Sequence, residues 1–188
     1  MCIFAFMDHS VFSQTYKTHV QSLYSYGIGL GYPHEICLDA IQDVFCKLYT
    51  QNLLADINNI KYYLFRSLKN RLIDIRKSTK KEINQLNENE EFSIEVSIMD
   101  HILISEEEIL LKNKVESLLK LLTDRQREAI YLRYMQELEY EEIGRLLDMN
   151  AESVRKLVHR GIDKIRKNTD PNTFLLVLIF LMKYFLKY

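Results

Sequence analysis

The sequence predicts an all-α fold in which two small helical domains are joined by a linker and followed by a hydrophobic C-terminal helix. Of the 188 residues, 47% are hydrophobic, which is enough to fill a core, and only five are Gly and two are Pro. Long segments therefore run without a helix breaker. Hydrophobic residues recur at helical spacing in two zones, and an acidic segment with weak periodicity separates these zones.

In the first zone, the spacing predicts a helix from about residue 34 to 49 and another from about 61 to 77, after an earlier helix that starts near residue 10. The loop GIGLGYP at residues 27–33 is expected to end that earlier helix. The hydrophobic faces of the two later helices consist of Cys37, Ala40, Ile41, Val44, Phe45 and Leu48, and of Leu64, Phe65, Leu68, Leu72 and Ile75.

The segment over residues 82–105 contains no Lys or Arg. Its acidic residues are five glutamates and one aspartate: Glu82, Glu88, Glu90, Glu91, Glu95 and Asp100. Asn and Ser are frequent, and helical periodicity is weak. This composition predicts a linker that is at least partly flexible.

The second zone begins with two capping motifs, S-x-x-E at Ser105 and T-x-x-Q at Thr123, each of which predicts a helix start. A short helix is expected from about residue 140 to 147, then a turn, then a helix over residues 151–167. Asn150 suits the N-cap of this last helix, because its side-chain oxygen can accept from the free amides of the first turn. Together these elements predict a helix-turn-helix.

The helix over residues 151–167 has the composition of a DNA-binding helix. Its predicted buried stripe follows the 3.6-residue period and is expected to pack on Ile143, Leu146 and Leu147. Residues 152–167 contain six Lys or Arg and two acids, a net charge of +4. Most charged helix faces are merely solvated, but the short helix, the turn and the basic helix together favour DNA contact. The predicted stripe is Val154, Leu157, Val158, Ile162 and Ile165, and the predicted DNA contacts are Ser153, Arg155, Lys156, His159 and Arg160.

Other classes of protein are less well supported. The whole-chain charge is −1, so only the distribution of charge indicates nucleic acid. Cys2, Cys37 and Cys46 are odd in number and lack CxxC spacing, which disfavours a disulfide framework or zinc site and fits a reducing cytoplasm. The start, MCIFAFMDHS, is not expected to be a signal peptide. No Gly-rich phosphate loop, metal-ligand cluster or nucleophile elbow is present, so we expect no catalytic residue, no metal and no cofactor.

At residues 121–167 the sequence resembles region four of the extracytoplasmic-function (ECF) sigma factors of bacterial RNA polymerase, in the sigma-70 family. Three positions depart from that pattern: Leu157 stands where Arg is frequent, Gly144 replaces Ala, and Glu139 replaces Ser before the short helix. Gly144 is expected to allow close helix packing. The residues that carry the resemblance are Leu122, Arg127, Glu128, Glu142, Ile143 and Gly144, then Ser153, Val154, Arg155, Lys156, His159, Arg160 and Gly161.

The first zone resembles region two of the same family in the segments DAIQDVFCKLY (residues 39–49) and YYLFRSLKNRLIDIRK (residues 62–77), where Tyr63 replaces Trp. The resemblance implies a region-two-like domain of three or four helices over residues 1–80 and an acidic linker over 81–104. A region-four-like helix-turn-helix domain would follow over 105–168, and a hydrophobic tail over 169–188.

The resemblance implies a specificity subunit that binds core RNA polymerase, recognises the −35 and −10 promoter elements and helps to melt DNA, without catalysis of its own. Residues 61–81 carry eight Lys or Arg and one Asp, a net charge of +7, interleaved with aromatic residues that could stack on unpaired bases. The −35 contacts would be the residues given above for the last helix. The −10 contacts would be Tyr62, Tyr63, Arg66, Lys69, Asn70, Arg71, Arg76 and Lys77, and the polymerase-docking residues would be Asp39, Gln42, Asp43 and Phe45.

The expected partners are core RNA polymerase, promoter DNA and an anti-sigma factor, with no small-molecule substrate. The apolar part of this tail, residues 174–188, would span ~22 Å as a helix, short of the ~30 Å hydrocarbon core of a bilayer. We therefore expect it to pack within the protein or on a partner, and membrane-surface contact is the less favoured alternative. One hypothesis is that the tail holds the two domains together until polymerase binds.

Two alternatives remain open at this stage. A stand-alone helix-turn-helix regulator would bind DNA as a dimer without polymerase, but it would not need the second basic zone. A sigma-like decoy would instead bind an anti-sigma partner through its docking face. An enzyme is the least favoured reading.

Overall fold

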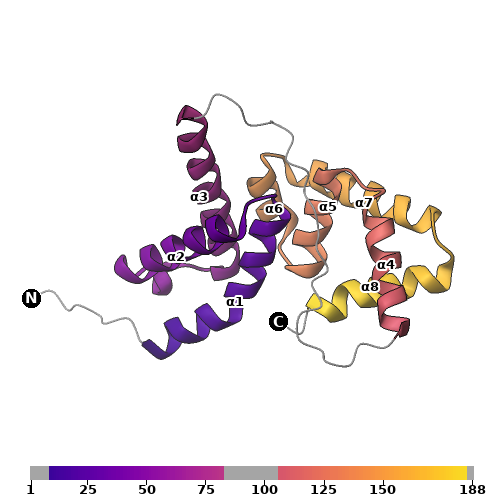
Figure 1. Cartoon of the computed structure of the whole chain (residues 1–188), viewed down its shortest axis with the longest axis horizontal. Helices are drawn as coiled ribbons and strands as arrows, with labels where there is room; N and C mark the ends of the chain where they lie inside the picture. Colours follow the sequence, from indigo (N-terminus) through magenta and orange to yellow (C-terminus); the bar gives the residue numbers. More distant parts are fainter. Residues whose placement is uncertain (1–8, 83–105, 186–188) are drawn as a thin grey trace, which may run out of the picture. The chain divides into compact units, whose positions relative to one another are not determined.

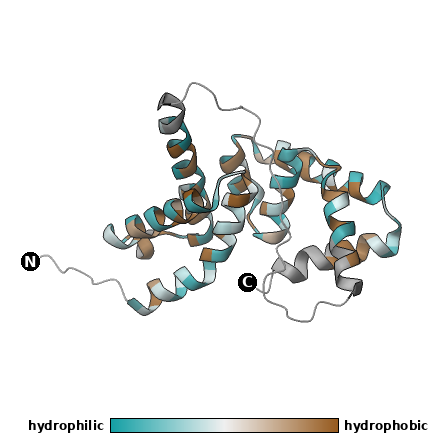
Figure 2. Ribbon diagram, in the orientation of Figure 1, coloured by the Kyte–Doolittle hydropathy of each residue, from teal (hydrophilic) through white to brown (hydrophobic). Residues whose placement is uncertain are grey.

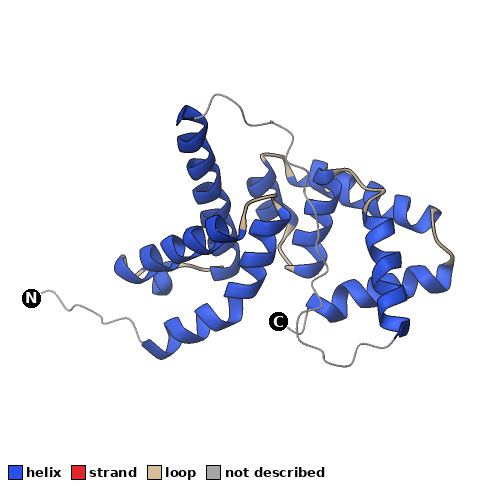
Figure 3. Cartoon of the chain, viewed as in Figure 1, coloured by secondary structure: helices blue, strands red, loops and turns tan. Residues whose placement is uncertain are grey.

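The structure, a computed structural model, describes residues 9–82 and 106–185. These residues form helices and connecting loops, and no strand occurs among them (Figure 3). The chain divides into two compact units, one containing α1 to α3 and the other α4 to α8. The prediction of an all-α fold with two helical domains is therefore confirmed. The expected linker and the capping motif at Ser105 lie outside the described residues.

The first unit consists of α1 (His9–Gly29), α2 (His34–Thr50), the short 3-10 helix η1 (Leu53–Asp56) and α3 (Ile60–Glu82). The three α-helices pack against one another (Figure 1). All six residues predicted for the hydrophobic face of α2 are buried, and so are four of the five predicted for α3. Ile75 is only half-buried. Leu23 and Tyr26 of α1 complete this core.

The expected loop at residues 27–33 is shorter than predicted, because α1 continues to Gly29 and the turn occupies only the next four residues. The reason is the contact between α1 and α2. A Cβ added to Gly27 would lie 2.8 Å from the Cys37 Sγ atom, so glycine at this position permits the two helices to approach. Gly27 is therefore a packing residue of α1, not a helix terminator.

The second unit consists of α4 (Glu106–Leu119), α5 (Asp124–Ile130), a turn of π-helix η2 (Tyr131–Met135), α6 (Tyr140–Leu147), α7 (Ala151–Lys167) and α8 (Pro171–Phe185). Helices α5, α6 and α7 carry both hydrophobic and hydrophilic residues, which Figure 2 draws in brown and teal. The core gathers side chains from all the helices of this unit, including Val115, Ile130, Leu132 and Val177.

The capping box at Thr123 is confirmed: its hydroxyl accepts from the Gln126 N–H, and the Gln126 side chain accepts from the Thr123 N–H. Arg127 and Glu128 of the family motif are both buried, and Arg127 pairs with Asp124. These two residues therefore lie mostly inside the unit and present little surface to a partner.

Candidate nucleic-acid interface

The helix-turn-helix consists of α6, a three-residue turn and α7, with the bounds that the sequence predicts. The Glu142 carboxylate accepts from the Glu139 N–H at 2.9 Å at the start of α6. Asp148 ends α6 in the left-handed conformation, with φ 53°, and the Asn150 side chain accepts from the Ser153 N–H at 2.7 Å to cap α7. An N-cap of this kind stabilises a helix by about 1 kcal/mol, so the local sequence itself defines where α7 begins.

Gly144 brings α6 close to the turn. The Met149 N–H donates to the Gly144 carbonyl at 2.8 Å, and a Cβ on Gly144 would lie only 2.6 Å from the Met149 carbonyl oxygen. The expectation that glycine allows close packing here agrees with this geometry.

The buried side of α7 differs in part from the predicted stripe. Val154, Val158 and Ile165 are buried as expected, but Leu157 and Ile162 are half-buried, and Gly161 takes a buried position instead. The stripe is narrower because α5 approaches α7 directly at Gly161, where a Cβ would meet Ile130 at 2.7 Å. Leu157 thus lies at the edge of the outward face.

The predicted contact residues of α7 lie on one exposed face. Arg155, Lys156, His159 and Arg160 are exposed and Ser153 is half-buried. Because residues three and four apart are neighbours on a helix, these side chains form a continuous surface. The structure therefore brings all five predicted residues together.

Two acidic residues hold part of this cationic face. Glu152 pairs with Arg155 at 2.9 Å and with Lys156 at 3.4 Å, and the hydrogen bonds from Lys156 and then from Arg155 lower the pKa of its carboxyl group. The His159 Nδ1 atom lies 3.1 Å from Asp163. Arg160, by contrast, forms no ion pair among the described side chains of its unit.

Tyr140, at the first position of α6, is a member of this site that the sequence did not reveal. The guanidinium carbon of Arg133 lies 4.7 Å from the centre of its ring, and that of Arg155 lies 5.0 Å from it. Both distances fall within the range of cation–π attraction. The partners are 7 and 15 residues from Tyr140, so periodicity within one helix does not bring them together.

The predicted −10 residues lie on α3. The Arg66 guanidinium donates to the Tyr62 hydroxyl at 3.2 Å, and Arg76 lies over the ring of Tyr32, 5.8 Å from its centre. Tyr62, Tyr63 and Lys69 are half-buried, whereas Asn70 and Lys77 are exposed. A hollow of about 460 Å³ adjoins Tyr63. Its lining residues are Asp43, Val44, Lys47, Tyr63, Ser67, Asn70, Arg71 and Asp74.

An ion pair joins the predicted docking face of α2 to the predicted DNA patch of α3. Two nitrogens of Arg71 lie 2.7 and 2.6 Å from the same carboxylate oxygen of Asp43. Both side chains are about half exposed, so the pair contributes at most about 1 kcal/mol to stability. The pair links α2 to α3 at the point where the two predicted surfaces meet.

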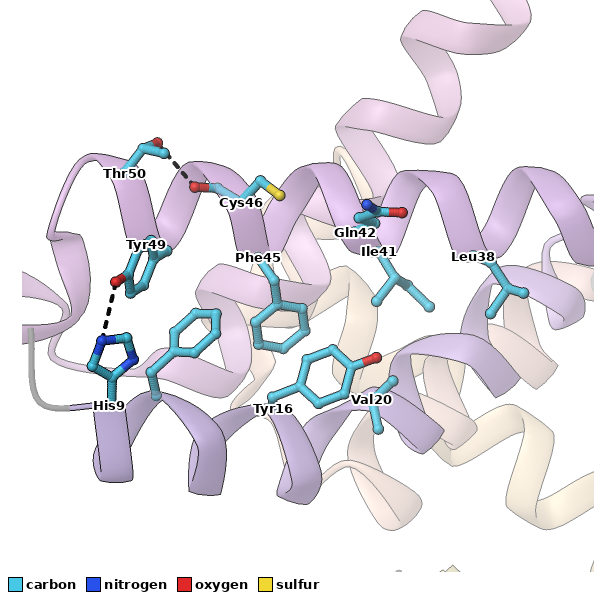
Figure 4. Close-up of a pocket in the computed structure, with 11 residues that line it drawn as sticks. His9, Tyr16, Val20, Leu38, Ile41, Gln42, Phe45, Cys46, Tyr49 and Thr50 are labelled. Atoms are coloured by element: carbon cyan, nitrogen blue, oxygen red, sulfur yellow. Dashed lines mark hydrogen bonds between the residues drawn. The ribbon is translucent and has the colours of Figure 1, made fainter.

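The predicted docking residues of α2 do not share one environment. Asp39, Gln42 and Asp43 are exposed, but Phe45 is only 3% exposed and packs in the core. Phe45 also lines an apolar groove of about 540 Å³ between α1 and α2 (Figure 4). Phe12 and Tyr16 of α1 meet it edge to face, with ring centres 6.0 and 4.9 Å away. The sequence alone does not reveal this groove, because the groove depends on how α1 and α2 pack against each other.

No cluster of three or more His, Cys, Asp or Glu side chains suited to a metal ion occurs in residues 9–82 and 106–185. Across the same residues, every helix is too short or too polar to cross a bilayer.

The chain is similar to known proteins of one kind. A family model for sigma-70, region 4, matches residues 118–167. The ECF RNA polymerase sigma factor SigM of Bacillus subtilis (strain 168) is 20% identical over 153 residues, which cover 81% of this chain and 91% of that protein. The ECF RNA polymerase sigma factor SigW of the same organism is 28% identical over 145 residues, covering 73% and 77%.

Two solved structures share the fold. One is the sigma factor RpoE in complex with the anti-sigma factor NepR from Bartonella quintana, with a TM-score of 0.57, 21% identity and coverage of 84% of this chain and 96% of that one. The other is CnrH in complex with the cytosolic domain of CnrY, with a TM-score of 0.50, 19% identity and coverage of 86% and 89%.

The fold and the site thus define a helical protein of two units, one of which presents a cationic helix-turn-helix. Residues 118–167 match the sigma-70, region 4, model, and the chain is similar over most of its length to two RNA polymerase sigma factors of the ECF type.

Proposed function

We propose that this protein is an RNA polymerase sigma factor of the ECF type, which brings core RNA polymerase to promoters by reading a −35 element with α7 and a −10 element with α3. The observation that carries the proposal is the exposed face of α7, on which Arg155, Lys156, His159 and Arg160 lie together. A protruding cationic helix can enter the major groove, where phosphates and the acceptor edges of guanine lie within reach of long side chains. Ser153 adds a hydroxyl near the N-terminal end of the same face.

The second contact involves the basic patch on α3. Arg66, Arg76 and Lys77 supply positive charge for the backbone, while Tyr62 and Tyr63 offer ring faces on which unpaired bases can stack. The pairing of Arg66 with the Tyr62 hydroxyl supports a joint role for these two residues. Lys69, Asn70 and Arg71 complete the proposed −10 surface, which would stabilise melted DNA.

Core polymerase would dock on the polar face of α2, at Asp39, Gln42 and Asp43, which are exposed. Phe45 would support this face from beneath, since its ring is buried. The RpoE and CnrH structures contain the bound partners NepR and CnrY. By analogy, we propose that an anti-sigma factor also controls this chain by covering the surfaces that polymerase needs.

The test is run-off transcription with purified core RNA polymerase on a pool of templates whose upstream regions are randomised. We expect RNA only when the full-length chain is added, and the transcribed templates should share two sequence elements separated by a fixed spacing. Arg160→Ala should weaken selection of the upstream element, because Arg160 is exposed and forms no ion pair among the described side chains of its unit.

Lys167→Ala provides a matched control, since Lys167 is also exposed on α7 but lies at its last position. This variant should select the same elements as the wild type. If the chain does not associate with polymerase but shifts duplex DNA by itself, the protein acts as a stand-alone regulator and the proposal is wrong.

A further inference from the structure

Arg155 is held by residues from two helices. Its guanidinium group lies over the ring of Tyr140 on α6 and donates to Glu152 on its own helix, α7, at 2.9 Å. A long arginine side chain normally loses conformational entropy when a ligand fixes it. Here much of that ordering is in place before DNA arrives, and such preorganisation lowers the cost of binding.

Arg133 shares the same ring but does not depend on it. Its guanidinium donates to the Leu138 carbonyl at 2.9 Å and lies 3.4 Å from Glu139. Loss of the ring would therefore leave Arg133 with two other partners. Arg155 would keep Glu152, a residue one turn away on the same helix, and would lose the contact that joins it to α6 in the described part of the chain.

We propose that Tyr140 is a positioning residue for Arg155, fixing the guanidinium plane in the orientation with which α7 reads one base pair of the upstream promoter element. The ring face is the effective group, because the planar guanidinium of Arg stacks on aromatic faces as the ammonium of Lys does not. This inference rests on the proposed function and adds to it a residue outside α7. Tyr140 itself need not touch DNA.

In the opposite role, Tyr140 and Glu152 would hold Arg155 away from DNA. The two roles differ in sign. If the Tyr140 ring positions Arg155, removing the ring makes DNA selection weaker and less specific. If the ring withholds Arg155, removing it makes selection stronger.

The experiment measures which upstream sequences the complete holoenzyme, this chain with core polymerase, enriches from a pool of randomised duplex DNA. Tyr140→Leu should lower affinity about threefold, in line with an exposed cation–π contact, and should broaden base preference at one position. Tyr140→Phe keeps the ring and should retain the wild-type preference. Arg155→Gln should lower affinity about tenfold, as expected for one lost base contact. It should also lose the base preference at the same position that Tyr140→Leu broadens.

The double variant Tyr140→Leu/Arg155→Gln tests whether the two residues act together. If Tyr140 works through Arg155, the double variant should be no weaker than Arg155→Gln alone. Additive losses would overturn the positioning role, and so would tighter binding by Tyr140→Leu. Arg155→Lys leaves Tyr140 in place, so its result does not depend on whether the Tyr140 variants fold. This variant keeps the charge, yet it should lose the base preference.

The wild-type holoenzyme separates the two levels of the proposal. If it enriches no upstream sequence, both the proposed function and this inference are wrong. If it does so and Tyr140→Leu retains the same base preference, the positioning role alone is wrong.

Discussion

Two glycines of the second unit differ in what an added methyl group would meet. At Gly144 the nearest atom is the backbone carbonyl oxygen of Met149, 2.6 Å away, in the turn that the helix-turn-helix depends on. At Gly161 it is the terminal Cδ1 atom of Ile130, 2.7 Å away. A side-chain end can rotate, whereas the turn backbone is fixed by its hydrogen bond from Met149 to Gly144.

Gly144→Ala should therefore destabilise the second unit by about 1–3 kcal/mol, as expected for overpacking. Gly161→Ala is the matched control: rotation of Ile130 costs little, and alanine gains about 1 kcal/mol of helix propensity over glycine. Urea unfolding of the full chain, followed by circular dichroism, measures both. A neutral or stabilising Gly144→Ala would show that the turn can yield.

Contacts between helices mark the limit of what single residues predict. The sequence alone supplied the N-cap Asn150 and the outward set from Ser153 to Arg160, because both depend on spacing within one helix. It did not predict the stacking of Arg155 on Tyr140 or the pairing of Arg71 with Asp43, which lie 28 positions apart. Partners of this kind are decided by how two helices cross, and periodicity does not specify the crossing.

At the scale of elements, the C-terminal helix α8 gains its position from one buried side. Val177 is 1% exposed and packs in the core, while Leu175, Leu176 and Ile179 are 58%, 51% and 48% exposed. The helix contacts η2 and α7, and Arg166 lies over the ring of Phe174, 5.2 Å from its centre. The expected packing within the protein is thus present on one side, and an apolar side is left outward.

Val177→Ala should destabilise the second unit by about 1–3 kcal/mol, because it removes buried methyl groups and leaves a cavity. Leu175→Ala removes a larger but exposed side chain from the same helix and should change stability by less than about 0.5 kcal/mol. Thermal unfolding of both variants makes the comparison. Equal effects would mean that α8 does not dock through Val177.

The helix ends show which local signals are reliable. The bounds of α6 and α7 were predicted correctly because a cap or an unfavourable residue marks each end, as Asn150 does for α7. The end of α1 was predicted too early because glycine has two uses. In a loop it allows unusual backbone angles, but Gly27 instead makes room for Cys37 on the neighbouring helix. The sequence does not distinguish the two uses.

At the scale of the whole molecule, the two units have separate cores, and a histidine is buried in the first of them. His19 lies in the core of the first unit at 9% exposure. Burial lowers its pKa below the ordinary value of 6.5, and the positive charge of Lys61 on α3 lowers it further. Burial also raises the pKa of Cys37 in this core to about 11, so its thiol stays protonated at neutral pH and adds no titration there.

The first unit should therefore lose stability as the solution becomes acidic. In the unfolded chain His19 takes up a proton near pH 6.5, whereas in the folded unit it does so only at lower pH, so the unfolded state binds more protons in between. The stability that neutral His19 contributes is complete above about pH 6.5 and falls as the pH drops below that value.

Differential scanning calorimetry of the full chain at about pH 7.5 and about pH 5.5 should show two transitions, of which one moves to lower temperature in acid. His19→Gln should reduce that shift, while His159→Gln, an exposed position in the other unit, should leave it unchanged. A single transition would contradict separate unfolding of the two units. An acid shift that persists fully in His19→Gln would place the acid sensitivity in groups other than His19.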